Sequence, residues 1–220
     1  MTLALEVVPD SAAAATRVAS LVAERAEESV ARSGSFTLAL SKAPWQMFDA
    51  LVAGNLPWSA MSIFQVDERI APTGHNDRNL IALSAGLPPE AKASLRPMPV
   101  EEANLEAAAG RYAAELPAHL DLVHLGLGAD GHTASLVPGD PVLEIRDRLV
   151  AITREYQGHR RMTLTYPALA AAREIVWLVT GDTKRDALER LLAGDTSIPA
   201  VRIFNPRQLV IADEAAMSSS

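Results

Sequence analysis

Residues 120–140 read LDLVHLGLGADGHTASLVPGD, and in this stretch an apolar segment leads directly into a glycine-rich loop. The first part, 120–125, has the composition of a buried strand. Gly126, Gly128 and Gly131 follow it and allow the backbone to turn sharply and approach a ligand closely. In parallel α/β sheets ligands bind beyond the carboxyl ends of strands, so this junction is a candidate binding region.

The segments on both sides of this stretch alternate between strand and helix patterns. Apolar runs predict further strands at 36–40, 61–66, 175–179 and 207–212. Periodicity and capping residues, among them Asp10, Pro44 and Asp182, predict helices over 11–32, 44–54, 79–83, 100–116 and 183–192. We therefore predict an α/β fold with a mostly parallel sheet flanked by helices on both faces. Residues 1–217 are predicted to form a single domain and 218–220 a disordered tail.

The composition limits the class of protein. The chain has 220 residues, of which 49% are hydrophobic and none is cysteine. Disulfides, thiolate nucleophiles and Cys-based zinc sites are therefore excluded. The net charge of −7 argues against a nucleic-acid partner, because neutralising phosphates requires clustered Lys and Arg. No secretory signal and no apolar run of ~18 residues is present, so we expect a cytoplasmic protein without a membrane partner. The sequence leaves open whether it is a monomer or a small homo-oligomer.

The three glycines also satisfy the spacing GxGxxG, which is typical of dinucleotide-binding sites. That fingerprint requires a helix directly after the glycines and an acidic residue at the end of the next strand. Here Pro138 and Gly139 would end any helix after a few residues. The pattern therefore does not indicate a nicotinamide or flavin cofactor.

His132 is the candidate general base, because it follows the glycine loop at the predicted edge of the sheet. An imidazole with an ordinary pKa near ~6.5 is able to accept a proton at neutral pH, and activity should fall as it becomes protonated. A purely structural role, such as capping or a bond to a nearby carbonyl, explains the position equally well. Ser135 is a weaker candidate for a nucleophile, since no GxSxG motif surrounds it.

Charged residues follow other predicted strands and helix starts. Asp67, Glu68 and Arg69 come directly after the strand at 61–66, where an arginine is able to bind a phosphate or carboxyl oxygen. An ordinary surface ion pair is the competing interpretation. Further cations stand at Arg78, Arg160–Arg161 and Lys184–Arg185. The spacing of the other four histidines does not match a metal site; they are His75, His119, His124 and His159. Of these, His124 is predicted to lie in the core.

Four ordered motifs resemble the 6-phosphogluconolactonase family. The most specific is 120–139, with its Asp-Gly-His-Thr-Ala-Ser-Leu run, and the others are VDERIAPTGHNDRN at 66–79, RMTLTYPAL at 161–169 and WLVTGDTKRDAL at 177–188. The similarity covers nearly the whole chain. It implies a fold similar to ribose-5-phosphate isomerase and glucosamine-6-phosphate deaminase, with neither a cofactor nor a metal.

The resemblance also implies a reaction, the hydrolysis of 6-phospho-D-glucono-1,5-lactone to 6-phosphogluconate in the oxidative pentose phosphate pathway. It places His132 as the base that activates water, with Arg69 and the amides of the glycine loop stabilising the carbonyl oxygen. Asp67 would position Arg69 or a sugar hydroxyl. The substrate-binding candidates are Ser41, Lys42, Gly128, Asp130, Gly131, Thr133, Arg78, Arg161 and Lys184.

The chain departs from the family pattern after the strand at 36–40. The family usually has Ser-Gly-Gly-Ser-Thr-Pro there, whose amides surround a phosphate, whereas this chain has Ser41-Lys42-Ala43-Pro44. The loop is two residues shorter and lacks glycine, so we expect weaker phosphate binding. Lys42 would contribute a point charge in place of several fixed amides.

The sequence leaves two other functions open. A glucosamine-6-phosphate deaminase would resemble the chain as far as Gly131-His132, but such enzymes typically continue with Asn-Glu-Pro where this chain has 135–138. Ammonia release would identify that activity. A sugar-phosphate binding protein without catalysis is the second alternative, suggested by the shortened loop.

Overall fold

A central sheet of seven parallel strands organises the computed structural model, which describes residues 3–217. The strand order is β1-β10-β9-β6-β2-β3-β5. The strands are β1 (Ala4–Val8), β2 (Phe36–Leu40), β3 (Met61–Gln65), β5 (Leu95–Arg96), β6 (Leu122–Gly126), β9 (Ile175–Val179) and β10 (Gln208–Asp213). The predicted tail at 218–220 lies outside the described residues.

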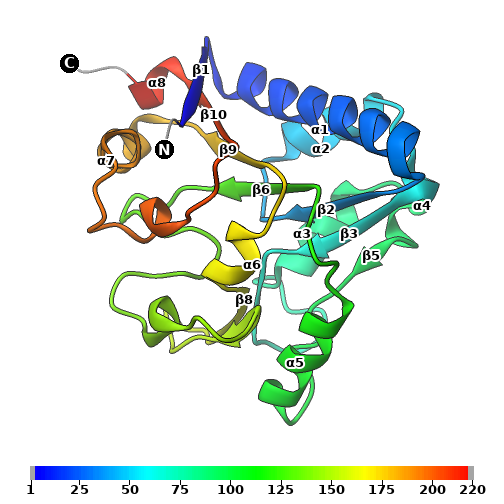
Figure 1. Ribbon diagram of the computed structural model, residues 1–220, viewed down its shortest axis with the longest axis vertical. Coiled ribbons are helices and arrows are strands. Elements are labelled where there is room, and N and C mark those ends of the chain that lie inside the picture. Colours follow the sequence, from blue (N-terminus) through cyan, green and yellow to red (C-terminus); the bar gives the residue numbers. More distant parts are fainter. Residues whose placement is uncertain (1–2, 218–220) are drawn as a thin grey trace.

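Helices cover both faces of this sheet, as the sequence predicted. Figure 1 shows α1 and α2 along one side and α5 and α6 on the other. Along β6, Leu122 packs in the first layer while Val123 and Leu125 pack in the second, because successive strand residues point to opposite faces. The helices are α1 (Ser11–Ser33), α2 (Trp45–Ala53), α3 (Asn79–Gly86), α4 (Pro89–Lys92), α5 (Leu105–Glu115), α6 (Tyr166–Ala170), α7 (Arg185–Ala193) and α8 (Glu214–Met217).

A second, antiparallel sheet was not anticipated from the sequence. It has the order β4-β8-β7 and consists of β4 (Asp67–Arg69), β7 (Val150–Ile152) and β8 (Arg161–Leu164). In its register Asp67 faces Thr163, and Arg69 faces Arg161. These strands are too short to give a clear periodic pattern. The small sheet nevertheless brings two segments that are distant in the sequence to the same edge of the central sheet.

Most of the predicted helix and strand boundaries agree with the structure. Of the predicted helix caps Asp10 and Asp182, the first is confirmed and the second is wrong. Asp10 caps α1 by accepting a hydrogen bond from the Ala13 amide, and Gly34 ends that helix with φ 77°. By contrast, Asp182 does not cap α7: it begins a short 3₁₀ turn, Asp182–Lys184, that precedes the helix. The helix predicted over 100–116 begins only at Leu105, because Asn104 accepts a hydrogen bond from the Ala107 amide and fixes the start there.

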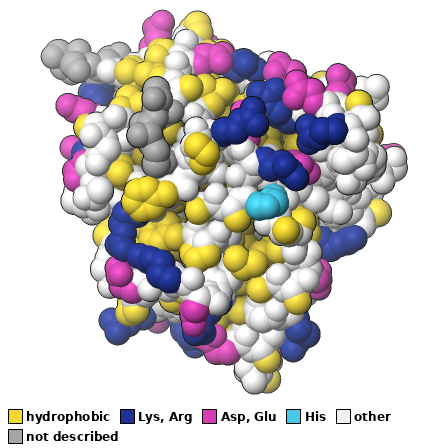
Figure 2. Space-filling model, viewed as in Figure 1, with side chains coloured by type: hydrophobic (Ala, Val, Ile, Leu, Met, Phe, Trp, Pro, Cys, Tyr) yellow, Lys and Arg dark blue, Asp and Glu magenta, His cyan; other side chains and the backbone are white. Residues whose placement is uncertain are grey.

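Ion pairs neutralise much of the surface charge. Arg25 contacts Glu174 at 2.6 Å, and Arg173 contacts Asp121 at 3.2 Å. On the face shown in Figure 2, a group of Lys and Arg side chains has Asp and Glu side chains beside it.

Among the described helices, none combines the length and the apolar character that crossing a membrane requires.

Candidate active site

A polar cleft of about 190 Å³ opens at the carboxyl ends of β2, β3 and β6. Four basic side chains and one carboxylate line it, together with His132 and small residues. The lining residues are Ser41, Lys42, Asp67, Arg69, Asn79, Gly126, Leu127, Gly128, His132, Ala134, Arg161 and Lys184. The excess of positive charge favours an anionic small molecule.

The loop after β6 folds back on itself and holds His132 at the cleft. The Gly128 amide donates to the His132 carbonyl at 2.8 Å, and the Gly131 amide donates to the Gly128 carbonyl at 2.9 Å. A Cβ atom on Gly128 would lie 2.1 Å from His132 Nδ1, so only glycine allows the imidazole to pack there. No helix follows in 127–140, which agrees with excluding a dinucleotide-binding loop.

Asp130 fixes the orientation of the His132 ring. Its Oδ1 lies 2.5 Å from His132 Nδ1, and its Oδ2 accepts a hydrogen bond from the Tyr156 hydroxyl at 3.0 Å. Partial burial raises the pKa of Asp130, but the hydrogen bonds from His132 and Tyr156 outweigh it, and the net pKa lies below 3.8. Asp130 is therefore ionised at neutral pH. With Nδ1–H bonded to this carboxylate, Nε2 is the nitrogen that is available to accept a proton.

Asp67 joins β4 to the loop that carries His132. It accepts a hydrogen bond from Ser135 Oγ at 2.6 Å and a longer one from Asn79 Nδ2 at 3.3 Å. Burial raises its pKa, although Ser135 and the positive charge of Arg161 act in the opposite direction. Ser135 is fully buried, and its hydroxyl is engaged with Asp67, which argues against a nucleophilic role. The carboxylate of Asp67 forms no hydrogen bond with Arg69 among the described residues.

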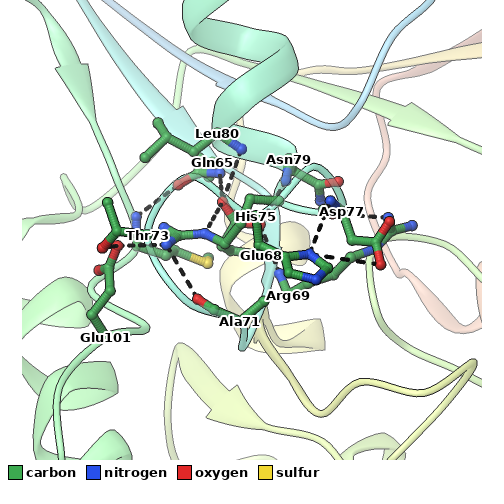
Figure 3. A network of polar contacts seen from close by, with 12 residues as sticks. Gln65, Glu68, Arg69, Ala71, Thr73, His75, Asp77, Asn79, Leu80 and Glu101 are labelled. Carbon is green, nitrogen blue, oxygen red and sulfur yellow. Dashed lines mark hydrogen bonds and ion pairs between the residues drawn. The ribbon is translucent and has the colours of Figure 1, made fainter.

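A network around Glu68 holds the segment that carries Arg69 (Figure 3). The buried carboxylate of Glu68 accepts hydrogen bonds from the backbone amides of Arg69, Asn79 and Leu80 at 2.7–2.8 Å. It thereby caps the start of α3 and fixes the backbone of Arg69. The Arg69 guanidinium donates through NH1 to the Asp77 carbonyl at 2.9 Å, while its Nε is buried without a partner.

The other cations of the cleft differ in how far they are already paired. Arg161 is 4% exposed, and its NH2 donates weakly to the Tyr156 carbonyl at 3.3 Å. The Nε atom of Arg161 is also buried without a hydrogen-bond partner among the described residues, and burial lowers the pKa of the Arg161 guanidinium. Lys42 and Lys184 form no salt bridge with any residue in 3–217. Unpaired donors of this kind are what an anionic substrate would satisfy.

Most of the predicted site residues meet in this cleft. Ser41, Lys42, Gly128, Arg161 and Lys184 line it together with the predicted catalytic group, His132, Arg69 and Asp67. Asp130 stands behind His132.

Asp130 and three further predicted binding residues do not line the cleft. Thr133 is buried and donates to the Gly126 carbonyl, and Gly131 packs against Ile198. Arg78 is 3% exposed, and its guanidinium pairs with Glu68 and Glu101. A buried arginine between two carboxylates satisfies their charge, so Arg78 holds the fold of this segment.

The shortened loop at 41–44 lies beside the glycine loop, because β2 and β6 are neighbours in the sheet. The Ser41 amide donates to the His124 carbonyl at 3.3 Å, and Ser41 Oγ lies 3.3 Å from His124 Nδ1. His124 is buried, as predicted, and burial lowers its pKa to about 4. The Ser41 amide is thus not free to bind a phosphate.

Sequence reasoning missed Asn79 and Tyr156 as site residues. Asn79 lines the cleft and bonds to Asp67, yet in the sequence it only follows Arg78. Tyr156 precedes Gln157-Gly158, and a Gly-containing pair between two short strands is a hairpin signal that points to this position. No group of three or more His, Asp or Glu side chains in the described part of the chain could hold a metal ion.

The fold and the cleft define the class: an α/β protein with a cationic small-molecule site at the carboxyl edge of a parallel sheet. The sequence pattern of the glucosamine-6-phosphate isomerases/6-phosphogluconolactonase family matches residues 9–212, and the chain belongs to this family.

Individual proteins agree with this assignment. A 6-phosphogluconolactonase from Nostoc is 35% identical over 86% of this chain and 85% of its own length. The crystal structure of a 6-phosphogluconolactonase from Shewanella baltica superposes with a TM-score of 0.86 at 25% identity, covering 96% of this chain and 97% of that one. A monomeric glucosamine-6-phosphate deaminase has the same TM-score at 16% identity, over 97% and 98%, and shares the fold.

Proposed function

We propose that this protein hydrolyses 6-phospho-D-glucono-1,5-lactone to 6-phosphogluconate, as a cytoplasmic enzyme of the oxidative pentose phosphate pathway. The observation that carries the proposal is the cleft itself. In it His132, oriented through Nδ1 by ionised Asp130, lies with four cations at the edge of the parallel sheet. Similarity to proteins named 6-phosphogluconolactonase supports the same substrate.

The proposed reaction begins with water near His132. Nε2 removes a proton as the water oxygen bonds to the lactone carbonyl carbon, and the carbonyl oxygen becomes negatively charged. Arg69 stabilises that charge, whereas the Gly128 and Gly131 amides already donate within the loop. When the ester bond to the ring oxygen breaks, the His132 imidazolium returns the proton to the departing oxygen. General-base catalysis of this kind supplies ~10²- to 10⁴-fold in rate.

The substrate phosphate is assigned to Lys42, Lys184 and Arg161. These side chains line the cleft, and the two lysines are without salt bridges among the described residues. The 41–44 loop offers no glycine amides, so side-chain charge replaces the amides as the source of affinity. Ammonium groups bind phosphate as point charges, which gives weaker orientation than several fixed amides.

A hydrolysis assay with freshly prepared 6-phosphogluconolactone tests the proposal, after correction for spontaneous decay in buffer. We expect wild-type protein to exceed that decay. Binding of 6-phosphogluconate without any acceleration would instead support the sugar-phosphate binding protein, an alternative that the shortened loop motivates. Release of ammonia from glucosamine 6-phosphate would identify the deaminase activity.

A further inference from the structure

The turn between β7 and β8 is a tight hairpin beside the cleft. Tyr156 and His159 form an isolated antiparallel bridge, with N–H to carbonyl distances of 3.0 and 3.3 Å. Between them Gln157 and Gly158 have φ values of 51° and 81°. Two successive residues with positive φ are typical of the tight hairpin turn that matches strand twist. We call residues 156–159 the hairpin tip.

One side of the hairpin tip contacts the residues that orient the proposed base. The Tyr156 hydroxyl donates to Asp130 Oδ2 at 3.0 Å, and the other oxygen of Asp130 bonds to His132. The Tyr156 ring also meets the His132 ring edge-on, with centroids 5.6 Å apart. Burial, followed by the hydrogen bond to Asp130, raises the pKa of Tyr156, so the hydroxyl keeps its proton and acts as a donor.

The opposite side of the hairpin tip contacts the segment that carries Arg69. His159 Nε2 lies 2.9 Å from Asp77 Oδ2, and the Asp77 carbonyl accepts the hydrogen bond from Arg69. His75 packs edge-on against His159, with ring centroids 5.7 Å apart. Figure 3 shows Arg69 and His75 both directed toward Asp77. Fixing Asp77 therefore fixes the carbonyl that accepts the hydrogen bond from the Arg69 guanidinium.

Arg161 lies at the base of the same hairpin. Its guanidinium carbon is 5.0 Å from the centroid of the Tyr156 ring, and its NH2 donates to the Tyr156 carbonyl. The tip thus contacts the proposed base and a proposed phosphate ligand directly, and it reaches the proposed oxyanion donor, Arg69, through Asp77. Tyr156 and His159 themselves are absent from the cleft lining.

We propose that the hairpin tip is a positioning element, in which Tyr156 orients His132 through Asp130 and His159 orients Arg69 through Asp77. This inference rests on the proposed lactone hydrolysis. Neither residue contacts the substrate, so both act on turnover more than on substrate binding. A merely structural turn would instead affect stability and leave kcat unchanged in the folded fraction.

The first test replaces Tyr156 with Phe, which keeps the ring and removes only the hydroxyl. We expect kcat for 6-phosphogluconolactone to fall about tenfold, the effect of losing one hydrogen bond to a charged group. KM should stay within about twofold, because the cations of the cleft are untouched.

Tyr166→Phe is the matched control. Tyr166 is buried, and its hydroxyl donates to the Pro199 carbonyl at 2.9 Å outside the cleft. This variant should keep the wild-type kcat. An unchanged kcat in Tyr156→Phe, a change confined to KM, or an equal fall in Tyr166→Phe would overturn the role of Tyr156.

The second test compares His159→Ala with His159→Gln. Alanine removes the donor to Asp77 and should lower kcat several-fold, whereas the Gln side-chain amide is able to donate to Asp77 and should restore most of it. Equal activity of the two variants would overturn the role of His159. These outcomes are separable from the proposed function. If wild-type protein fails to hydrolyse the lactone, the proposed function is wrong. If wild-type protein hydrolyses it and the variants are equally active, the positioning role is wrong.

Discussion

The loop after β6 and the loop after β2 lie side by side at the same edge of the sheet but are built in opposite ways. The first, at 126–137, uses glycines to fold back and fix one imidazole with its backbone. The second, at 41–44, has no glycine, and its first amide is bonded to the His124 carbonyl. The comparison indicates that this chain fixes the backbone at the loop where we propose proton transfer, and relies on side-chain charge at the loop where we propose that the anion binds.

Among the changes in these two loops, replacing His132 with Ala should reduce activity the most. We expect kcat to fall ~10²- to 10⁴-fold, because the proposed general base is lost. The side chain is partly exposed and contributes little to the core, so the melting temperature should change little. Lactone hydrolysis with a parallel thermal melt measures both, and retained kcat would remove His132 from the mechanism.

Gly128→Ala tests whether the backbone of this loop sets the position of the base. An added Cβ would lie 2.1 Å from His132 Nδ1 and 2.6 Å from Asp130 Oδ1, so the pair must move. We expect kcat to fall about 100-fold, the order of effect that a 1 Å displacement of a catalytic group causes. Gly110→Ala is the matched control, since its Cβ would meet no atom within 4 Å. Equal activity of the two variants would contradict the argument.

His124 connects the two loops, and its burial predicts a dependence of stability on pH. Its pKa is lowered to about 4 in the folded state. An unfolded chain would protonate the imidazole near ~6.5, so the unfolded state binds more protons between these values and stability is lost as pH falls. Between pH 7 and pH 5 this group should cost about 2 kcal/mol of unfolding free energy.

Urea unfolding at both pH values measures the loss in stability. His124→Leu is the reference, because leucine does not titrate, and its loss should be smaller by that amount. The same pH dependence in both proteins would show that His124 does not contribute.

The smallest expected effect concerns the second loop. Inserting Gly-Gly between Ser41 and Lys42 should lower KM for the phosphorylated lactone roughly 2- to 10-fold, because glycine amides would add hydrogen bonds to the phosphate. Ala-Ala inserted at the same point is the control for length, since alanine does not readily adopt positive φ. An unchanged KM would show that the phosphate is held elsewhere.

Much of the fold and the centre of the site could be predicted from the sequence. The strands at 36–40 and 175–179 match β2 and β9 residue for residue, because continuous apolar runs are local signals. The small sheet was missed because its strands are short and pair with partners far along the chain. Asp182 was wrongly predicted to cap α7. Residues Asp182–Lys184 form a 3₁₀ turn instead, and α7 begins only at Arg185.

The sequence by itself determined the alternation of strands and helices, the glycine loop and the candidacy of His132, since each depends on residues that are close along the chain. Only the tertiary structure decided which charges share the cleft. Arg161 reaches it through the register of β8 with β4, whereas Arg78 is taken up by Glu68 and Glu101. Tyr156 meets Asp130 through the geometry of a hairpin turn. Such contacts depend on sheet pairing and turn conformation, which local composition does not encode.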